Sequence, residues 1–491
     1  MNFLGIDIGT SGCKAVVFNA DGRPLASARR EYQVRLTPDG GAELDPTEVM
    51  NHCFAVLADA AQQAGRGSVT AIGISSQGEA VTPIDRHGRP LANAMVSSDA
   101  RPAAQAQTWP RQFGEDRLYQ ITGHTAHPLF TLFKLLWLQE HRPDVWRGAA
   151  KFLCFEDLLH ARLGVDPALG WPLAGRTMLF DVRQHQWSGE ILDRIGLTPQ
   201  QLARPLPSGT IAGTVRPDLA SELGLAAGAT VVTGGHDQPC SALGAGVIEP
   251  GAAMYATGTV ECITPAFERM ILTEALRRHN LCTYDHAVPG LYTTVAYSLT
   301  GGNLLQWFRD QFAPAQDYGE LLKTAAPEPT RLLVLPYWTP SGTPYFDLNT
   351  PGAILGLRLA TTRGEILRAL LEGVAFEMRL NLEILRESGC EIRELRAIGG
   401  GAESAFWTQL KANVLGCTIT TLNVTEAGCL GAALLACAAT TGRPLRDLAR
   451  HWIKPVATLA PRAVAARWYD EQFARYRRLY PVLRQFASGP E

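Results

Sequence analysis

Short apolar runs at the start of the chain predict a β-meander. The runs cover residues 3–8, 13–18 and 25–32, and turns rich in glycine, asparagine and hydroxyl residues separate them at 9–12 and 19–22. Apolar runs of this length between such turns are typical of strands joined by tight connections. We therefore expect three consecutive strands at the N-terminus.

Helical and strand patterns alternate through the rest of the first half. Apolar residues recur at helical spacing over 46–64, and a strand pattern covers 71–75. Residues 101–206 are predicted to form a long helical or irregular region. A strand at 230–233 then leads through Gly234-Gly235-His236-Asp237 into a helix of small residues at 238–246.

The second half begins like the first. An apolar strand at 252–257, a Gly258-Thr259 turn and a returning strand at 261–264 repeat the strand, Gly-Thr, strand unit of the N-terminus. Each unit is followed by long helices and a later glycine-rich strand end. This echo predicts two duplicated α/β domains that face a cleft.

The length of the chain agrees with two domains. A chain of 491 residues exceeds what one hydrophobic core usually supports. No low-complexity linker separates the halves, so we place the boundary at a short hinge near 246–251. The expected domains are residues 1–246 and 247–491.

Composition and charge narrow the class of protein. Hydrophobic residues make up 46% and charged residues 19%, as in ordinary globular proteins. The net charge of -2 gives no reason to expect nucleic acid or an anionic membrane as a partner. The N-terminus lacks the features of a signal peptide, and the apolar stretch 427–439 is too short to span a bilayer. We interpret that stretch as a buried, closely packed helix.

The spacing of the cysteines along the sequence matches no metal-binding motif and indicates no disulfide bonds. The ten cysteines include no CxxC pair and no zinc spacing with histidine. Most lie in apolar runs, where cysteine is usually a small buried hydrophobe. Reduced thiols and a cytoplasmic location are the simplest interpretation.

The first candidate site is the turn after the first strand. Asp7 ends the strand, and Thr10, Ser11 and Lys14 follow among glycines. An acidic strand end beside exposed amides and hydroxyls can hold a hydrated Mg²⁺ next to a phosphate. The ending of a Walker A loop is missing. The alternative is an ordinary hairpin in which Asp7 caps a turn.

The second candidate is Asp237, which follows a predicted strand and opens a helix. Ligands of α/β sheets bind at this edge, so Asp237 could accept the proton of a substrate hydroxyl while Gln238 holds a neighbouring one. The alternative is a helix cap, since aspartate is a good N-cap residue. His236 has no marked serine or cysteine partner, which favours a structural role.

Two further segments are less specific. The glycine turn at 398–404 could lie against a flat adenine or ribose, and it lacks the GxGxxG spacing of a dinucleotide fold. Residues 352–357 predict a strand, followed by a loop and an amphipathic helix that includes 365–373. Core packing explains this last segment.

Taken in order, these segments resemble the FGGY family of carbohydrate kinases. The matching blocks are residues 5–14, 133–141, 234–246, 352–372, 397–402 and a terminal helix near 469–480. The resemblance implies an actin-like, ribonuclease H-like fold of two α/β domains that close over ATP, Mg²⁺ and a sugar, with the sugar site and catalytic aspartate in the first domain and the ATP site in the second.

The resemblance also implies individual roles. Asp237 falls on the family's catalytic base, and Asp7 on the aspartate that helps to organise Mg²⁺, with Asp237 as the second carboxylate near the metal. The positions that fall on the ATP and phosphate site are Thr10, Ser11, Lys14, Gly258, Thr259, Gly400, Gly401 and Ala402. The positions that fall on the substrate side are Gln77, Gly78, Glu79, Asp99 and Gln238.

Departures from the family pattern bear on the substrate. Xylulose kinases place a Met-His pair where this chain has Gly78-Glu79, and glycerol kinases place Arg-Glu there. Relative to glycerol kinases, Gly78, Ser97, Leu129 and Cys262 each remove bulk or a polar group. A cavity widened in this way would hold a three-carbon triol poorly. We expect a xylulose-like ketose, sugar or sugar alcohol larger than glycerol.

Two alternatives come from other classes. A non-catalytic actin-like regulator would bind sugar or nucleotide without turnover, but both Asp7 and Asp237 are retained. A phosphotransferase acting on a carboxylate would not need Glu79, Asp99 and Gln238 for hydroxyls. A homodimer is among the expected assemblies.

Overall fold

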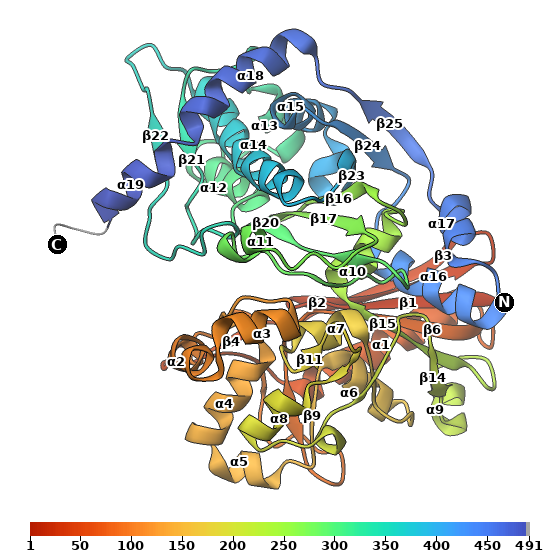
Figure 1. The fold of residues 1–491 in the computed structure, drawn as a ribbon. Coiled ribbons are helices and arrows are strands. Elements are labelled where there is room, and N and C mark those ends of the chain that lie inside the picture. The colour runs from red at the N-terminus through yellow and green to blue at the C-terminus, as the bar shows by residue number, and fades with distance from the viewer. Residues whose placement is uncertain (488–491) are drawn as a thin grey trace.

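The computed structural model describes residues 1–487, and it contains two lobes, each built around a mixed β-sheet (Figure 1). The sheet of the first lobe has the strand order β14-β15-β6-β1-β2-β3. Its strands are β1 (Asn2–Ile8), β2 (Gly12–Asn19), β3 (Pro24–Glu31), β6 (Val69–Ser76), β14 (Ile211–Thr214) and β15 (Thr230–His236). The meander predicted at the N-terminus is confirmed.

The second sheet repeats this topology. Its main strands are β16 (Gly251–Thr257), β17 (Glu261–Phe267), β20 (Ala296–Ser298), β23 (Ile392–Ile398), β24 (Thr418–Leu422) and β25 (Pro455–Leu459). In each sheet the first strand pairs antiparallel with the second and parallel with a later strand: β1 with β2 and β6, and β16 with β17 and β23. The duplication expected from the Gly-Thr echo is therefore present in the strand order.

Two helices of small residues lie between the sheets. They are α10 (Asp237–Gly244) and α16 (Ala427–Thr441), which pack on each other, and α16 also packs on β1 and β6. A Cβ at Gly244 would overlap the carbonyl oxygen of Ala427, and one at Gly431 would overlap that of Cys240. Glycine is thus required where these backbones meet, and the predicted close packing of 427–439 is confirmed.

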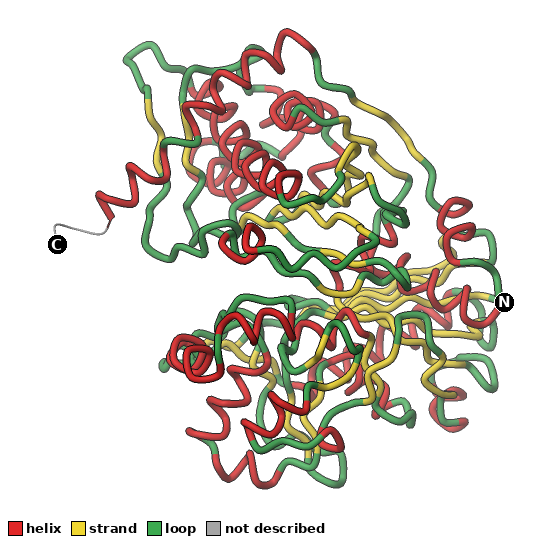
Figure 2. Tube along the Cα trace, in the orientation of Figure 1, coloured by secondary structure: helices red, strands yellow, loops and turns green. Residues whose placement is uncertain are grey.

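Larger helices cover the outer faces of the sheets (Figure 2). In the first lobe, α1 (Pro46–Gln63) packs on β2 and β3 and begins at Asp45, whose carboxylate accepts from the amides of Thr47 and Glu48. In the second lobe, α14 (Arg363–Glu387) begins at a capping box formed by Thr362 and Glu365. It packs on α15 (Ala405–Leu415), which in turn packs on α18 (Ala463–Tyr476).

Shorter elements complete both lobes. The region predicted as helical or irregular contains α2 (Ala103–Phe113), α3 (Glu115–Thr122), α4 (Thr131–His141), α5 (Pro143–Gly148), α6 (Phe155–Arg162), α7 (Trp171–Arg176) and α8 (Gly189–Ile195), with the short strands β9 (Lys151–Leu153) to β13 (Arg204–Leu206). The second lobe adds α11 (Glu274–Arg278), β18 (Tyr284–Asp285), β19 (Tyr292–Thr293), α12 (Gly302–Phe312), α13 (Tyr318–Lys323), β21 (Leu333–Leu335), β22 (Ala353–Leu355), α17 (Leu445–Trp452) and α19 (Leu479–Ala487).

Three further expectations concern the length of one strand, the state of the cysteines and membrane-spanning helices. The strand predicted at 230–233 is longer than expected: β15 continues through Gly234 and Gly235 to His236, and its register with β6 shifts before Gly235. All ten cysteines are buried and unpaired, as expected. Among residues 1–487, no helix is both long and apolar enough to cross a membrane.

Candidate active site

A cavity of about 550 Å³ lies between the two lobes and gathers many of the predicted residues. Its lining includes Thr10, Gln77, Gly78, Glu79, Ser97, Asp99, Leu129, Asp237, Gln238 and Cys262. The second lobe contributes Tyr297, Ser341 and Phe346 to the opposite wall. The fold thus brings residues from the ends of β6, β15 and β17 to one place.

Asp237 lies at the first turn of α10 and lines the cavity. The helix cap is His236, so the helix-cap alternative for Asp237 is wrong. The Asp237 side chain is 27% exposed. Burial raises the pKa of its carboxyl to about 8, helped by the charges of Asp7 and Glu79 and opposed by Arg176. A carboxylate with a raised pKa at a helix start beside a cavity is suited to proton transfer.

Asp7 lies near the carboxyl end of β1, on the same side of the sheet. Its Oδ1 accepts a 2.6 Å hydrogen bond from the hydroxyl of Ser75 on β6. Burial raises the pKa of Asp7, and the charge of Glu426 adds to this effect. A Cβ at Gly428 would lie 2.8 Å from the Asp7 carboxyl carbon, so the start of α16 leaves room for this carboxylate.

The turn after β1, which is the first candidate phosphate site, is held by hydrogen bonds to the buried Gln77 side chain. The amide of Gln77 donates to the carbonyl of Gly9 at 2.9 Å, and the hydroxyl of Thr10 donates to Gln77 Oε1 at 3.2 Å. Gln77 therefore supports the turn as well as lining the cavity. Ser11 is exposed, and Lys14 forms a 2.9 Å ion pair with Glu426 of the second half.

The residues of this site fit a magnesium ion held partly by phosphate. Within residues 1–487 there is no group of three or more His, Cys, Asp and Glu side chains that could hold a metal by itself. Mg²⁺ in kinases is usually bound through one or two carboxylates, with phosphate oxygens and water completing its shell. Asp7 and Asp237 supply two carboxylates, and the charge of Asp7 raises the pKa of Asp237.

Glu79 is held in an unusual backbone conformation by its surroundings. Its φ is 62°, and its carbonyl accepts 3.0 Å bonds from the Thr131 hydroxyl and the Lys134 ammonium. Its carboxylate accepts from the Ser97 hydroxyl at 2.7 Å and from Nε of Arg176 at 2.5 Å. Strained backbone of this kind is often found at functional sites.

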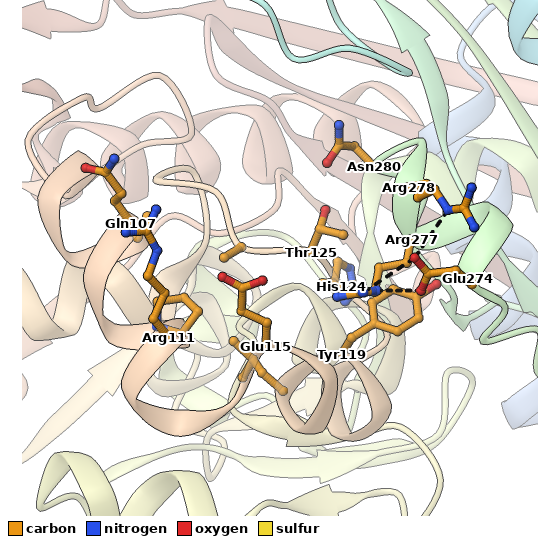
Figure 3. A pocket seen from close by; sticks show the side chains of 14 residues that line it. Gln107, Arg111, Glu115, Tyr119, His124, Thr125, Glu274, Arg277, Arg278 and Asn280 are labelled. Atoms are coloured by element: carbon orange, nitrogen blue, oxygen red, sulfur yellow. Dashed lines mark hydrogen bonds and ion pairs between the residues drawn. The ribbon is translucent and has the colours of Figure 1, made fainter.

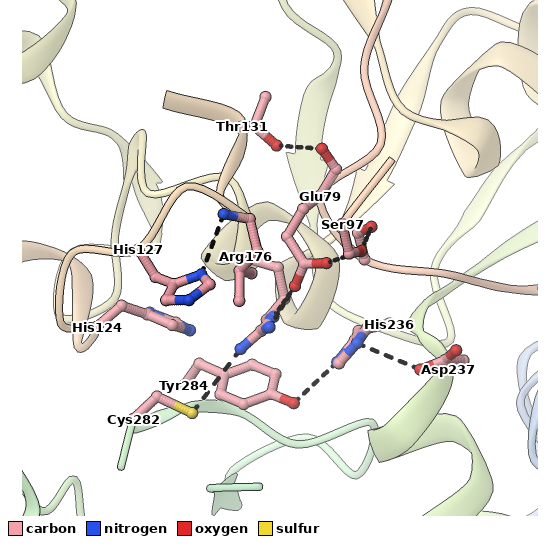
Figure 4. A network of polar contacts seen from close by, with 12 residues as sticks. Glu79, Ser97, His124, His127, Thr131, Arg176, His236, Asp237, Cys282 and Tyr284 are labelled. Carbon is pink, nitrogen blue, oxygen red and sulfur yellow. Dashed lines mark hydrogen bonds and ion pairs between the residues drawn. The ribbon is translucent and has the colours of Figure 1, made fainter. Parts of the chain in front are cut away.

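Arg176 was missed by sequence reasoning. It ends the short helix α7, far along the chain from Glu79, and no motif marks it. Its guanidinium lies 4.9 Å from the centre of the Phe130 ring and lines the cavity beside Gly78 (Figure 4). A guanidinium thus lies beside Gly78, although it comes from another element.

Asp99 lines the cavity, and both of its carboxylate oxygens already accept hydrogen bonds from other residues of the protein. Its side chain is fully buried, Arg101 donates to both carboxylate oxygens, and the amide of Ala42 donates to Oδ2 at 3.1 Å. This ion pair fixes the loop that carries Ser97 and Ser98 into the cavity wall.

The remaining phosphate and adenosine candidates lie in the second lobe. Gly258 and Thr259 form the exposed turn between β16 and β17, and their carbonyls accept from the amides of Gly302 and Asn303 at the start of α12. Gly400 lines a separate cavity of about 690 Å³. Gly401 has no room for a side chain, because a Cβ there would overlap Thr257. Ala402 follows in the same turn, where its amide bonds the Gly399 carbonyl.

A third cavity, of about 370 Å³, lies elsewhere between the lobes. It is lined by Arg111 and Glu115 from the first lobe and by Glu274 and Arg277 from the second (Figure 3). None of the residues singled out from the sequence lines it.

Comparison with known proteins identifies the architecture. The N-terminal domain of the FGGY family of carbohydrate kinases matches residues 2–244, and the C-terminal domain of the same family matches residues 253–440. The chain is 28% identical to a xylulose kinase of Bacillus subtilis over 97% of this chain and 96% of that protein. It is 31% identical to a glycerol kinase of Methylibium petroleiphilum over 88% and 89%.

Solved structures agree with this assignment. A crystal structure of xylulose kinase from Rhodospirillum rubrum is 25% identical and superposes with a TM-score of 0.90, covering 99% of this chain and all of the other. The fold expected from the resemblance, two actin-like, ribonuclease H-like domains, is confirmed. On the evidence of both family domains, the relatives and the cavity between the lobes, this chain belongs to the FGGY family of carbohydrate kinases.

Proposed function

We propose that the protein transfers the γ-phosphoryl group of ATP in line to a hydroxyl of a xylulose-like ketose, sugar or sugar alcohol larger than glycerol, with Asp237 as general base. The observation that carries the proposal is the position of Asp237 in the wall of the cavity, with Glu79 and Arg176 in the same wall. Phosphoryl transfer asks mainly for positioning and charge neutralisation.

The proposed roles follow from the geometry. Asp237 accepts the proton of the attacking hydroxyl, while Gln238 and the Arg176–Glu79 pair orient neighbouring hydroxyls. Mg²⁺, held by Asp7 and Asp237 together with the phosphates, would neutralise charge on the transferred group. The residues proposed to face ATP are Thr10, Ser11, Lys14, Gly258, Thr259, Gly400, Gly401 and Ala402.

The substrate size is proposed from the cavity wall. Gly78, Ser97, Leu129 and Cys262 all line the cavity with short or apolar side chains. Arg176 makes the cavity narrower on one side, and its guanidinium adds a polar group to the cavity wall. The relatives named xylulose kinase support a five-carbon substrate, and the relative named glycerol kinase supports a polyol.

A substrate panel tests the proposal. The purified chain with ATP and Mg²⁺ is offered pentuloses, hexuloses, pentitols, tetritols and glycerol, and ADP release is measured. We expect turnover with at least one substrate of four or more carbons. Glycerol as the best substrate would refute the size argument, and ATP binding without turnover on any sugar would favour the regulator. A cytoplasmic location and a homodimer stay predictions.

A further inference from the structure

Three side chains form a chain of polar contacts that ends on Asp237, with a hydrogen bond between Tyr284 and His236 and a close contact between His236 and Asp237. The hydroxyl of Tyr284 lies 2.9 Å from Nδ1 of His236, and Nε2 of His236 lies 3.2 Å from Oδ1 of Asp237 (Figure 4). His236 and Asp237 belong to the first lobe, at the junction of β15 and α10, whereas Tyr284 belongs to β18 of the second lobe. The chain therefore crosses between the lobes.

The hydrogen bond to Tyr284 orients the buried imidazole of His236, so that Nε2 faces Oδ1 of Asp237 at 3.2 Å. A general base must be ionised to act, and the oxygens of an ionised carboxylate can only accept. This contact therefore favours the tautomer with the proton on Nε2, in which Nδ1 accepts from the Tyr284 hydroxyl. Such an orienting group fixes the tautomer of a histidine that contacts a reacting residue.

Two glycines make room for the aromatic members. A Cβ at Gly78 would lie 3.0 Å from both Cδ2 and Nε2 of His236, which is tighter than nearly all real contacts. A Cβ at Gly175 would lie 3.2 Å from the Cβ of Tyr284. The His236 ring therefore occupies space that a side chain at position 78 would need.

The second lobe also touches the first through its backbone at this point. The amide of Thr283, next to Tyr284, donates to the carbonyl of Gly123 at 2.8 Å. In addition, His185 of the first lobe pairs with Asp285, the other neighbour of Tyr284, at 2.9 Å. Tyr284 is thus held against the first lobe from both sides.

We propose that His236 and Tyr284 are positioning residues, which hold Oδ1 of Asp237 so that Oδ2 is presented to the substrate hydroxyl, and that Gly78 is required because the His236 ring fills the adjoining space. This inference rests on the proposed role of Asp237 as base. The orientation of the Asp237 carboxylate then depends on Tyr284 of the second lobe. Asp237 is therefore correctly oriented only when the two lobes are in contact at Thr283 and Tyr284.

Four variants test the proposal with the best substrate of the panel. A small misplacement of a catalytic group can lower the rate about 10²-fold. We expect His236→Ala to lower kcat by about 10²-fold and Gly78→Ala and Tyr284→Phe by about 10-fold, with the KM for ATP unchanged. His236→Gln keeps an amide N–H that can reach Asp237, and should restore most of the lost kcat. Gly189→Ala, in open space, and His87→Ala, an exposed histidine outside the cavity, are the matched controls.

Each outcome decides between separate claims. Wild-type kcat in His236→Ala, a loss confined to KM, or equal losses in His236→Gln and His236→Ala would overturn the inference. If thermal melting shows that His236→Ala does not fold, Gly78→Ala and Tyr284→Phe decide, since both keep the buried ring of His236. An active Asp237→Asn enzyme would instead overturn the proposed function, while leaving the contacts of His236 unexplained.

Discussion

The guanidinium of Arg176 pairs with the carboxylate of Glu79 inside the cavity wall, where the two side chains are only 12% and 4% exposed. The pair joins the end of α7 to the residue that follows β6 and Gly78. Breaking a buried ion pair from one side leaves an uncompensated charge and typically costs about 3–5 kcal/mol. The same pair lines the cavity that also contains Asp237, so its role in stability and its proposed role in substrate binding can be separated by mutation.

Arg176→Met should lower the free energy of unfolding by about 3–5 kcal/mol, because Glu79 is left buried and unpaired. The double variant Arg176→Met/Glu79→Gln should recover part of that loss. Arg176→Lys keeps the charge but not the planar fork, and should raise the KM for the sugar about 10-fold or more with a small effect on folding. Urea unfolding and steady-state kinetics measure the two effects. A Lys variant with unchanged KM would contradict a binding role for Arg176.

Gly428→Ala should impair the enzyme through Asp7. The added Cβ would lie 2.8 Å from the carboxyl carbon of Asp7 and must displace it, although alanine is the better helix former by about 1 kcal/mol. We expect kcat to fall about 10-fold or more, and the Mg²⁺ concentration needed for half-maximal rate to rise. If the effect passes through Asp7, Gly428→Ala will cause little further loss in an Asp7→Asn background. Additive losses would show that Gly428 acts elsewhere.

The buried carboxyl of Glu377 makes the free energy of unfolding depend on pH, and a substitution at this position should remove that dependence. Burial raises the pKa of this carboxyl to about 7, although the hydroxyls of Tyr476 and Tyr337 donate to it and lower the pKa in part. Because the folded pKa lies above the unfolded one, the contribution to stability is present below about pH 4.5 and is lost as pH rises through 7.

Glu377→Gln should therefore gain stability relative to the parent as pH rises from 5 to 8, by up to about 3 kcal/mol. Urea unfolding at the two pH values measures the difference. Glu320→Gln, at an exposed position of α13, is the control and should show no such trend. A constant difference at both pH values would mean that Glu377 is ionised throughout.

Much of the fold follows from local sequence signals. The N-terminal meander, α1 and the Gly-Thr echo depend on turn residues and apolar spacing, which are readable along the chain. The end of β15 was less accessible, because the strand continues past a register shift with β6, and Gly235, with a φ of 127°, pairs with Ser75 beyond it. Tertiary pairing outweighed the local propensity there.

The site was predictable only where a residue stands in a motif. Asp237, Glu79 and Gln238 follow strands in recognisable blocks, and all three line the cavity. Arg176 and Tyr284 belong to a short helix and a two-residue strand. Tertiary packing within the first lobe places Arg176 in the cavity wall, and packing between the lobes brings Tyr284 to His236. No spacing in the sequence carries that information.

The central claim is that Asp237 is the base of a phosphoryl transfer, and the most direct measurement is ADP release by Asp237→Asn with the best sugar of the panel. We expect the rate to fall by about 10²–10⁴-fold or more, with ATP affinity by calorimetry and the melting temperature preserved. Asp218→Asn, an exposed aspartate of α9 (Pro217–Glu222), should behave like the parent. A rate near that of the parent in Asp237→Asn would contradict the account.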